Sequence, residues 1–217
     1  MNLASLIDHT LLKPDTTGAM IEKLCAEAIE YRFCSVCVNP VWVPFAVELL
    51  EGEYPLVCSV VGFPLGATPL VAKEAEWVVL RGAGEVDMVL PVGLLKQGEN
   101  SEVLRVIKDV VDSVSGIPVK VILETCLLTR EEKITACSIS MDAGAAFVKT
   151  STGFSESGAT VPDIVLMRNT VGLQTGVKAS GGIRDYEKAV AMVEAGASRI
   201  GTSSGITIVN GSRKNSL

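Results

Sequence analysis

The stretch MDAGAAFVKT, residues 141–150, joins the end of one element to the start of the next. An amphipathic segment at 130–143 precedes it, Gly144 stands where helices commonly end, and 146–150 is a short apolar run. The same glycine-containing joint recurs at Arg81-Gly-Ala-Gly and at Glu194-Ala-Gly-Ala. This repeated order of helix, joint and strand predicts a parallel sheet whose strands are connected by helices.

The same alternation extends outward from this joint over the whole chain. The expected strands are residues 5–9, 35–39, 57–62, 86–90, 119–124, 146–150, 176–180 and 198–202. The expected helices are residues 14–31, 40–50, 69–81, 102–114, 130–143, 161–171, 185–195 and 204–209. Eight such units predict an α/β protein of the (β/α)8 TIM barrel class, one domain over residues 1–210 with a short flexible tail at 211–217. A doubly wound open sheet is the alternative.

The composition excludes several classes of function. The 217 residues are 48% hydrophobic with a net charge of −6, which argues against bulk disorder and against binding to nucleic acid or an anionic membrane. No apolar run approaches the length of a bilayer span, and the N-terminus lacks a signal-peptide pattern, so we expect a cytoplasmic protein. A mean hydropathy of +0.39 favours a homo-oligomer, a homodimer or homotetramer, that covers apolar surface.

The number and spacing of the cysteines and the histidine argue against a metal site. Six cysteines in a cytoplasmic chain indicate free thiols, and of these Cys34 and Cys37 have motif-like spacing, which we interpret as packing. The single histidine, His9, excludes a His-rich metal site. We expect His9 to be a structural residue at the barrel rim, with substrate contact as the alternative.

Two lysines stand at the ends of neighbouring strands, Lys149 and Lys178. Adjacent parallel strands lie about 4.8 Å apart, so the two ammonium groups would be close and the pKa of one would fall. A neutral amine attacks carbonyl carbons, so either lysine could form a Schiff base, with Asp87 as a general acid or base. The alternative is that both lysines form structural ion pairs with Asp87 and Glu124.

Small residues follow the last two strands at 180–183 (SGGI) and 201–205 (GTSSG). Barrel enzymes often bind a phosphate there through backbone N–H groups and a helix N-terminus. The alternative is that Ser203 or Ser204 only caps the following helix. A third stretch, 150–153 (TSTG), adds hydroxyl groups and a glycine, or is an ordinary turn.

Six motifs resemble the deoxyribose-phosphate aldolase family. They are DHTLL at 8–12, SVCVNP at 35–40, VVGFPLG at 60–66, EVDMV at 85–89, FVKTSTGF at 147–154 and KASGGI at 178–183, in family order from about residue 5 to about residue 210. The resemblance implies a class I aldolase on a TIM barrel. Such an enzyme reversibly cleaves 2-deoxy-D-ribose 5-phosphate to acetaldehyde and D-glyceraldehyde 3-phosphate, with small molecules as partners and without metal or cofactor.

The resemblance also implies roles for individual residues. Lys149 would be the Schiff-base lysine, Lys178 the neighbour that lowers its pKa, and Asp87 the acid/base partner acting through water, with Lys120 and Thr150 in support. The residues that match the family's phosphate-binding positions are Gly153, Gly181, Gly182, Ser203 and Ser204. Two departures matter: the tail at 211–217 has no tyrosine, and Phe154 stands where some relatives have lysine. Phosphate binding would then depend more on backbone N–H groups.

Two other functions remain open at this point. One is a different Schiff-base barrel, such as a transaldolase-like enzyme, which would use dihydroxyacetone rather than acetaldehyde as donor. The other is a sugar-phosphate-binding barrel without catalysis, which would keep the glycine loops but has no need of Lys149, Lys178 and Asp87 together.

Overall fold

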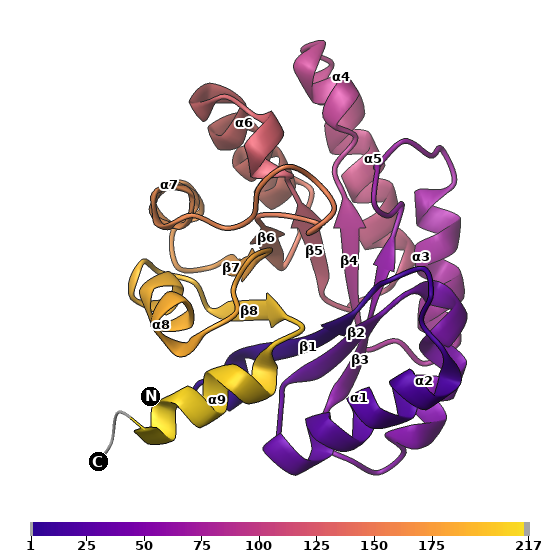
Figure 1. The fold of residues 1–217 in the computed structure, drawn as a ribbon. Helices are drawn as coiled ribbons and strands as arrows, with labels where there is room; N and C mark the ends of the chain where they lie inside the picture. Colours follow the sequence, from indigo (N-terminus) through magenta and orange to yellow (C-terminus); the bar gives the residue numbers. More distant parts are fainter. Residues whose placement is uncertain (1, 215–217) are drawn as a thin grey trace.

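The computed structural model describes residues 2–214 and shows a closed barrel of eight parallel strands paired in chain order (Figure 1). The strands are β1 (Ile7–Leu11), β2 (Ser35–Val38), β3 (Leu56–Val61), β4 (Glu85–Val89), β5 (Val119–Ile122), β6 (Phe147–Lys149), β7 (Gly176–Ser180) and β8 (Arg199–Thr202). Closure occurs between β8 and β1, where Asp8 pairs with Gly201. The predicted (β/α)8 barrel is confirmed, and the open sheet is excluded.

Helices surround the strands on the outside of the barrel (Figure 1). They are α1 (Gly18–Tyr31), α2 (Val43–Leu49), α3 (Val71–Leu80), α4 (Val92–Lys96), α5 (Asn100–Ser113), α6 (Arg130–Asp142), α7 (Val161–Val171), α8 (Tyr186–Glu194) and α9 (Gly205–Lys214). Three short 3-10 helices are η1 (Ala4–Leu6), η2 (Pro40–Trp42) and η3 (Thr125–Leu127). No helix of the described residues is long and apolar enough to cross a membrane.

The main hydrophobic core lies between the strands and the helices. Apolar side chains on the outer face of the strands, such as Val36, Val86 and Val148, are fully buried against the inner stripe of the helices. In α1 that stripe includes Ile21 and Leu24, which recur at helical spacing. The apolar periodicity in the sequence therefore arises from this layer between the strands and the helices. The side chains inside the barrel are of different residue types.

The glycine joints behave as predicted. Gly82, Gly144 and Gly196 follow the ends of α3, α6 and α8 with φ of 100°, 85° and 112°, a region that L side chains avoid. Each joint turns the chain directly into the next strand, so the barrel needs no long loop on that side.

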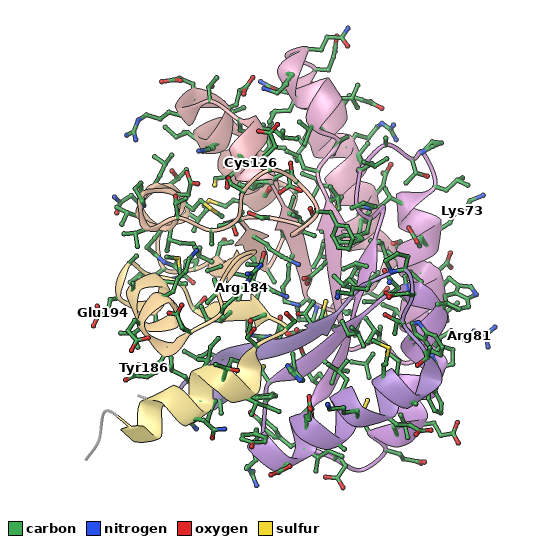
Figure 2. The ribbon with its side chains drawn as sticks, in the orientation of Figure 1. Lys73, Arg81, Cys126, Arg184, Tyr186 and Glu194 are labelled. Atoms are coloured by element: carbon green, nitrogen blue, oxygen red, sulfur yellow. The ribbon has the colours of Figure 1, made fainter. Side chains whose placement is uncertain are left out.

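Two expectations about helices were wrong. The short helix α4 was missed, because five residues after Pro91 carry too little periodicity to be distinguished from a loop. The last helix was expected at 204–209 with a loose tail from 211, but α9 continues to Lys214. Gly211 lets α9 pack closely on Tyr186 of α8, because a Cβ at this position would come within 2.7 Å of the Tyr186 side chain (Figure 2). Residues 215–217 of the expected tail lie outside the described residues.

Candidate active site

Every strand places at least one charged or thiol side chain among the groups that interact inside the barrel. They are Asp8 (β1), Cys37 (β2), Cys58 (β3), Glu85 and Asp87 (β4), Lys120 (β5), Lys149 (β6), Lys178 (β7) and Arg199 (β8). All except Arg199 are buried, with exposed fractions of 3% or less. Because an unpaired buried charge is very costly, this interior must be stabilised by mutual ion pairs.

Asp87 is the centre of these ion pairs. Its Oδ1 lies 2.8 Å from Nζ of Lys120, and its Oδ2 lies 2.7 Å from Nζ of both Lys149 and Lys178. The thiol of Cys58 also donates to Oδ1 at 3.2 Å. Burial alone would raise the pKa of Asp87, but the three ammonium groups outweigh it and hold that pKa well below its usual range. Asp87 is therefore an ionised carboxylate that serves as the shared counter-charge of the three ammonium groups.

Lys178 is held by two carboxylates, because it donates to Asp8 as well as to Asp87. Burial would lower the pKa of Lys178, yet these two carboxylates raise it above its ordinary value. Lys178 thus remains a cation, which contradicts the possibility that it is the neutral amine. Its side chain has room because Gly201 of β8 lies beside it: a Cβ there would come within 3.0 Å of Lys178 Cε.

A second group of ion pairs involves the first residues of β4 and β8. Arg199 donates to Glu85 at 3.0 and 3.2 Å and to Oδ1 of Asp8 at 2.7 Å. Glu85 also lies 2.7 Å from Lys120, and the Arg199 guanidinium stacks over the Phe147 ring at 5.3 Å. Sequence reasoning had not assigned a role to Glu85 or Arg199.

Lys149 reaches a cleft of about 390 Å³ that the βα loops surround at the carboxyl ends of the strands. Of the three lysines inside the barrel, Lys149 alone lines this cleft in the described part of the chain; Lys120 and Lys178 are completely covered. Lys149 is also the one with a single carboxylate partner, Asp87. The structure thus distinguishes two lysines that looked equivalent in the sequence: Lys149 lines the cleft, although it is only 2% exposed, and Lys178 does not.

Four of the five residues expected to bind phosphate line the same cleft: Gly153, Gly181, Gly182 and Ser203. Gly181 and Gly182 have φ of 86° and 72°, so this turn after β7 depends on glycine. Ser204 lies outside this cleft and lines a neighbouring cavity with His9. Its backbone N–H already donates to Thr202 Oγ1 at 2.9 Å, so the structure does not bring that group to the cleft.

Two cations in the cleft wall were not singled out by sequence reasoning. Lys13 follows β1 and Arg184 follows the glycine pair after β7, and both residues are exposed. Arg184 is labelled in Figure 2. Phe154 also lines the cleft, with its ring edge-on to Phe63 at 5.2 Å. The positive charge that a lysine at position 154 would have supplied is thus present on other loops. The position of Lys13 and Arg184, just beyond two matched motifs, was the available signal.

Three further residues have structural contacts. Glu124 accepts from the Thr152 hydroxyl and its backbone N–H. Of the alternative in which both lysines pair with Asp87 and Glu124, the pairs with Asp87 are therefore present, and pairs with Glu124 are not found among the described residues. Thr150 exchanges hydrogen bonds with the backbone of Ser180, which fixes β6 to β7 beside the two lysines. His9 is buried; its Nε2 lies 2.8 Å from Glu27, and its Nδ1 has no hydrogen-bond partner among the described residues.

The described residues contain one group with the spacing of a metal site, formed by Cys37, Cys58 and Asp87, whose ligand atoms lie within 4.8 Å of one another. Both oxygens of Asp87 already bind ammonium groups. Burial raises the pKa of Cys58 well above its usual value, whereas the side-chain interaction with Cys58 lowers the pKa of Cys37. A protonated thiol beside an occupied carboxylate is a poor donor set for a cation. All six cysteines are free.

Comparison with known proteins identifies the family. The profile of the DeoC/LacD family aldolases matches residues 3–211. The chain belongs to this aldolase family. Two similar curated proteins are both named deoxyribose-phosphate aldolase. One, from Brevibacillus brevis, is 60% identical over 98% of this chain and 97% of its own length. The other, from Exiguobacterium sibiricum, is 58% identical over 100% of this chain and 99% of its own.

A solved structure gives the same family. The deoxyribose phosphate aldolase from Aeropyrum pernix, described as a unique tetramer, superposes with a TM-score of 0.92 at 38% identity. The match covers 99% of this chain and 92% of that one. The aldolase barrel is therefore shared over essentially its full length.

Proposed function

We propose that this aldolase reversibly cleaves 2-deoxy-D-ribose 5-phosphate to acetaldehyde and D-glyceraldehyde 3-phosphate through a Schiff base on Lys149. The observation that carries the proposal is that Lys149 lines the cleft while its Nζ contacts Asp87, which also holds the buried Lys178. An accessible amine beside an ionised carboxylate and a second cation is the arrangement that carbonyl addition requires.

The reaction begins at Nζ of Lys149. The neutral amine adds to the C1 aldehyde of the open-chain sugar, and loss of water gives an iminium ion that can accept electrons. Asp87, through an intervening water, accepts the proton of the C3 hydroxyl, and the C2–C3 bond breaks with its electron pair moving into an enamine. D-Glyceraldehyde 3-phosphate leaves. Protonation of the enamine and hydrolysis of the iminium then release acetaldehyde and regenerate the amine.

Lys178 has a different role in this scheme. Because Asp8 and Asp87 keep it protonated, its positive charge lies next to Lys149 throughout the cycle. A neighbouring cation favours the neutral form of an amine, which is the form that attacks the substrate. Lys120 binds the other oxygen of Asp87 and so stabilises the same carboxylate.

The phosphate is expected at the far side of the cleft. Gly153, Gly181, Gly182 and Ser203 offer a wall of backbone and hydroxyl groups, and Lys13 and Arg184 supply positive charge. A chain with a net charge of −6 repels anions overall, so it needs such a local site. Fixing the phosphate orients C1 toward Lys149, which lowers the entropic part of the barrier.

The test is reductive trapping. The protein is incubated with acetaldehyde and sodium borohydride, digested, and its peptides are mapped by mass spectrometry. We expect a two-carbon adduct on Lys149. The matched control is Lys108→Met on the exposed face of α5, which should trap as well as wild type, whereas Lys149→Met should not. An adduct on Lys178 would exchange the roles of the two lysines.

The choice of donor separates this function from its alternatives. Trapping with dihydroxyacetone but not with acetaldehyde would indicate a transaldolase-like enzyme. A folded protein that traps neither carbonyl compound, yet binds sugar phosphates, would indicate a barrel that binds without catalysis.

We also propose that the protein is a cytoplasmic homodimer or homotetramer. Leu65, Leu80 and Leu173 are 77%, 77% and 90% exposed, which is apolar surface that a second copy could cover. Its six free cysteines suit a reducing compartment. Light scattering coupled to size exclusion would measure the mass; a monomer at micromolar concentration would contradict the oligomer.

A further inference from the structure

Glu85 and Arg199 form an ion pair that lies away from the cleft. They are the first residues of β4 and β8, whereas the cleft lies at the carboxyl ends of the strands, and neither residue lines it. Arg199 donates to both oxygens of Glu85, at 3.0 and 3.2 Å. Its side chain is 12% exposed and that of Glu85 is 4% exposed, so water screens this pair poorly.

Two chains of direct contacts connect this pair to the amine of Lys149. In the first, Arg199 holds Oδ1 of Asp8 at 2.7 Å, and Asp8 holds Lys178, which binds Oδ2 of Asp87. In the second, Glu85 lies 2.7 Å from Lys120, and Lys120 lies 2.8 Å from Oδ1 of Asp87. Both chains end at the one carboxylate that Lys149 contacts in the described part of the molecule.

The charges in this network are unequal. Its members are the carboxylates of Asp8, Glu85 and Asp87 and the cations Lys120, Lys149, Lys178 and Arg199. With every amine protonated, four positive charges face three negative ones. The other titratable groups around Lys149 are the thiols of Cys37 and Cys58 inside the barrel and, at the rim, Glu124, Lys13 and Arg184.

An excess of buried positive charge favours loss of one proton. Arg199 cannot supply it, because a guanidinium stays protonated in proteins. Lys120 and Lys178 are each held by at least two carboxylates, which raise their pKa. Lys149, with one carboxylate partner and a position in the cleft wall, is the cation of the network with the fewest balancing contacts among the described residues.

We propose that Glu85 and Arg199 are positioning residues that set the protonation of Lys149 from the opposite end of the barrel, and that they act in opposite directions. This rests on the proposed Schiff-base function of Lys149. Removing the Arg199 charge leaves the negative charges of Asp8 and Glu85 with one balancing cation fewer, which stabilises the protonated form of Lys149. Removing the Glu85 charge leaves the positive charges of Lys120 and Arg199 with one balancing carboxylate fewer, which favours the neutral form of Lys149.

The test measures how the rate of borohydride trapping with acetaldehyde depends on pH. In Arg199→Met the midpoint of the acid limb should move to higher pH, and in Glu85→Gln to lower pH, each by about one pH unit, the order of magnitude expected for a unit charge in a poorly screened interior. The double variant removes one charge of each sign and should return near the wild-type midpoint. Arg105→Met, on the exposed face of α5, is the matched control and should not move it.

A purely structural role would give a different result. Loss of packing would lower the amplitude of trapping or the melting temperature of both single variants. It would not shift the pH midpoints of trapping in opposite directions. Arg199→Lys keeps the charge and should keep the midpoint; if Arg199→Met does not fold, then Arg199→Lys, Glu85→Gln and the double variant carry the test. Equal midpoints in these folded variants, or shifts of the same sign, would overturn the proposal. Absence of any adduct on Lys149 in wild type would instead refute the proposed function.

Discussion

The Oδ2 atom of Asp87 lies 2.7 Å from the Nζ atom of Lys149. The same oxygen also binds Lys178, and Oδ1 binds Lys120, so a single carboxylate links the amine in the cleft to the buried charges. This contact joins the two parts of the site: a covered ion-pair network that determines protonation, and an open cleft that receives the ligand.

Replacing Asp87 with Asn should abolish most of the activity. An amide cannot accept a proton from the C3 hydroxyl, and three ammonium groups would lose their shared counter-charge. We expect kcat to fall by about 100-fold or more, the range for loss of a general acid or base. Steady-state kinetics of 2-deoxyribose 5-phosphate cleavage would measure this, with Asp109→Asn on the exposed face of α5 as control. A folded Asp87→Asn protein with wild-type kcat would contradict the mechanism.

Replacing Asp8 with Asn should destabilise the protein at neutral pH and flatten its acid denaturation. Burial raises the pKa of Asp8, but Lys178, Lys120 and Arg199 outweigh burial and lower it. A carboxyl group with a lowered folded pKa stabilises the protein above its unfolded pKa of about 3.9, and this stabilisation is lost as pH falls further. The variant should lose about 3–5 kcal/mol of unfolding free energy at pH 7, because buried cations lose their partner.

Urea titrations of wild type and Asp8→Asn between about pH 3 and pH 7 would test this dependence. The two unfolding free energies should stay about equally far apart from pH 7 down to about pH 4 and approach each other as the pH falls below 4; part of the difference remains at pH 3, because the folded pKa of Asp8 lies well below that of the unfolded chain. Asp112→Asn, whose carboxylate forms an exposed pair with Lys108, is the matched control and should differ little from wild type. A constant difference between Asp8→Asn and wild type across the whole range would show that the charge of Asp8 is not the cause.

Replacing Arg184 with Gln should weaken binding of the phosphate group alone. Arg184 lines the cleft and follows Gly181 and Gly182, which are expected to bind the phosphate, so its loss should raise KM for 2-deoxyribose 5-phosphate about tenfold with little change in kcat. KM for unphosphorylated 2-deoxyribose should not change. Arg81→Gln, whose guanidinium stacks over Trp77 (Arg81 is labelled in Figure 2), is the control. Equal effects on both substrates would refute a phosphate contact.

Replacing Thr129 with Ala should lower stability without changing catalysis. Thr129 caps α6: its side chain accepts from the Glu132 N–H, and the Glu132 carboxylate accepts from the Thr129 N–H in return. Loss of such a cap costs about 1 kcal/mol. Thermal denaturation would show the decrease, and Thr135→Ala in the interior of the same helix should not lower stability, since alanine is the better helix former. A large effect on kcat would contradict this separation.

Much of the barrel could be predicted because its signals are local. The joints at Gly82, Gly144 and Gly196 need a backbone conformation that glycine tolerates, and the apolar stripe of a helix repeats every few residues. The ends of the helices were predicted less accurately than their order. The first helix, α1, begins at Gly18 rather than at residue 14, because the polar residues before it are extended or in turns. The helix α4 is too short to show a period.

The site was only partly predictable. Motifs at the strand ends named Lys149, Lys178 and Asp87. Glu85 opens the EVDMV motif and Arg199 begins β8, but the sequence assigned no chemical role to either residue. Lys13 and Arg184 are on loops, and nothing local indicates that both loops face one cleft. Ser204 matched a pattern, but its N–H is used by Thr202, a contact that depends on the turn geometry.

The amino-acid sequence by itself determined the order of strands and helices, the α/β class and the presence of two lysines on adjacent strand ends. Only the tertiary structure decided which lysine is accessible. Lys149 and Lys178 are direct register partners, yet Lys178 is covered and held by Asp8, 170 residues away in the chain. That contact exists because β8 closes on β1, which brings the first strand beside the last. Barrel closure is a property of all eight strands together, so no single motif encodes it.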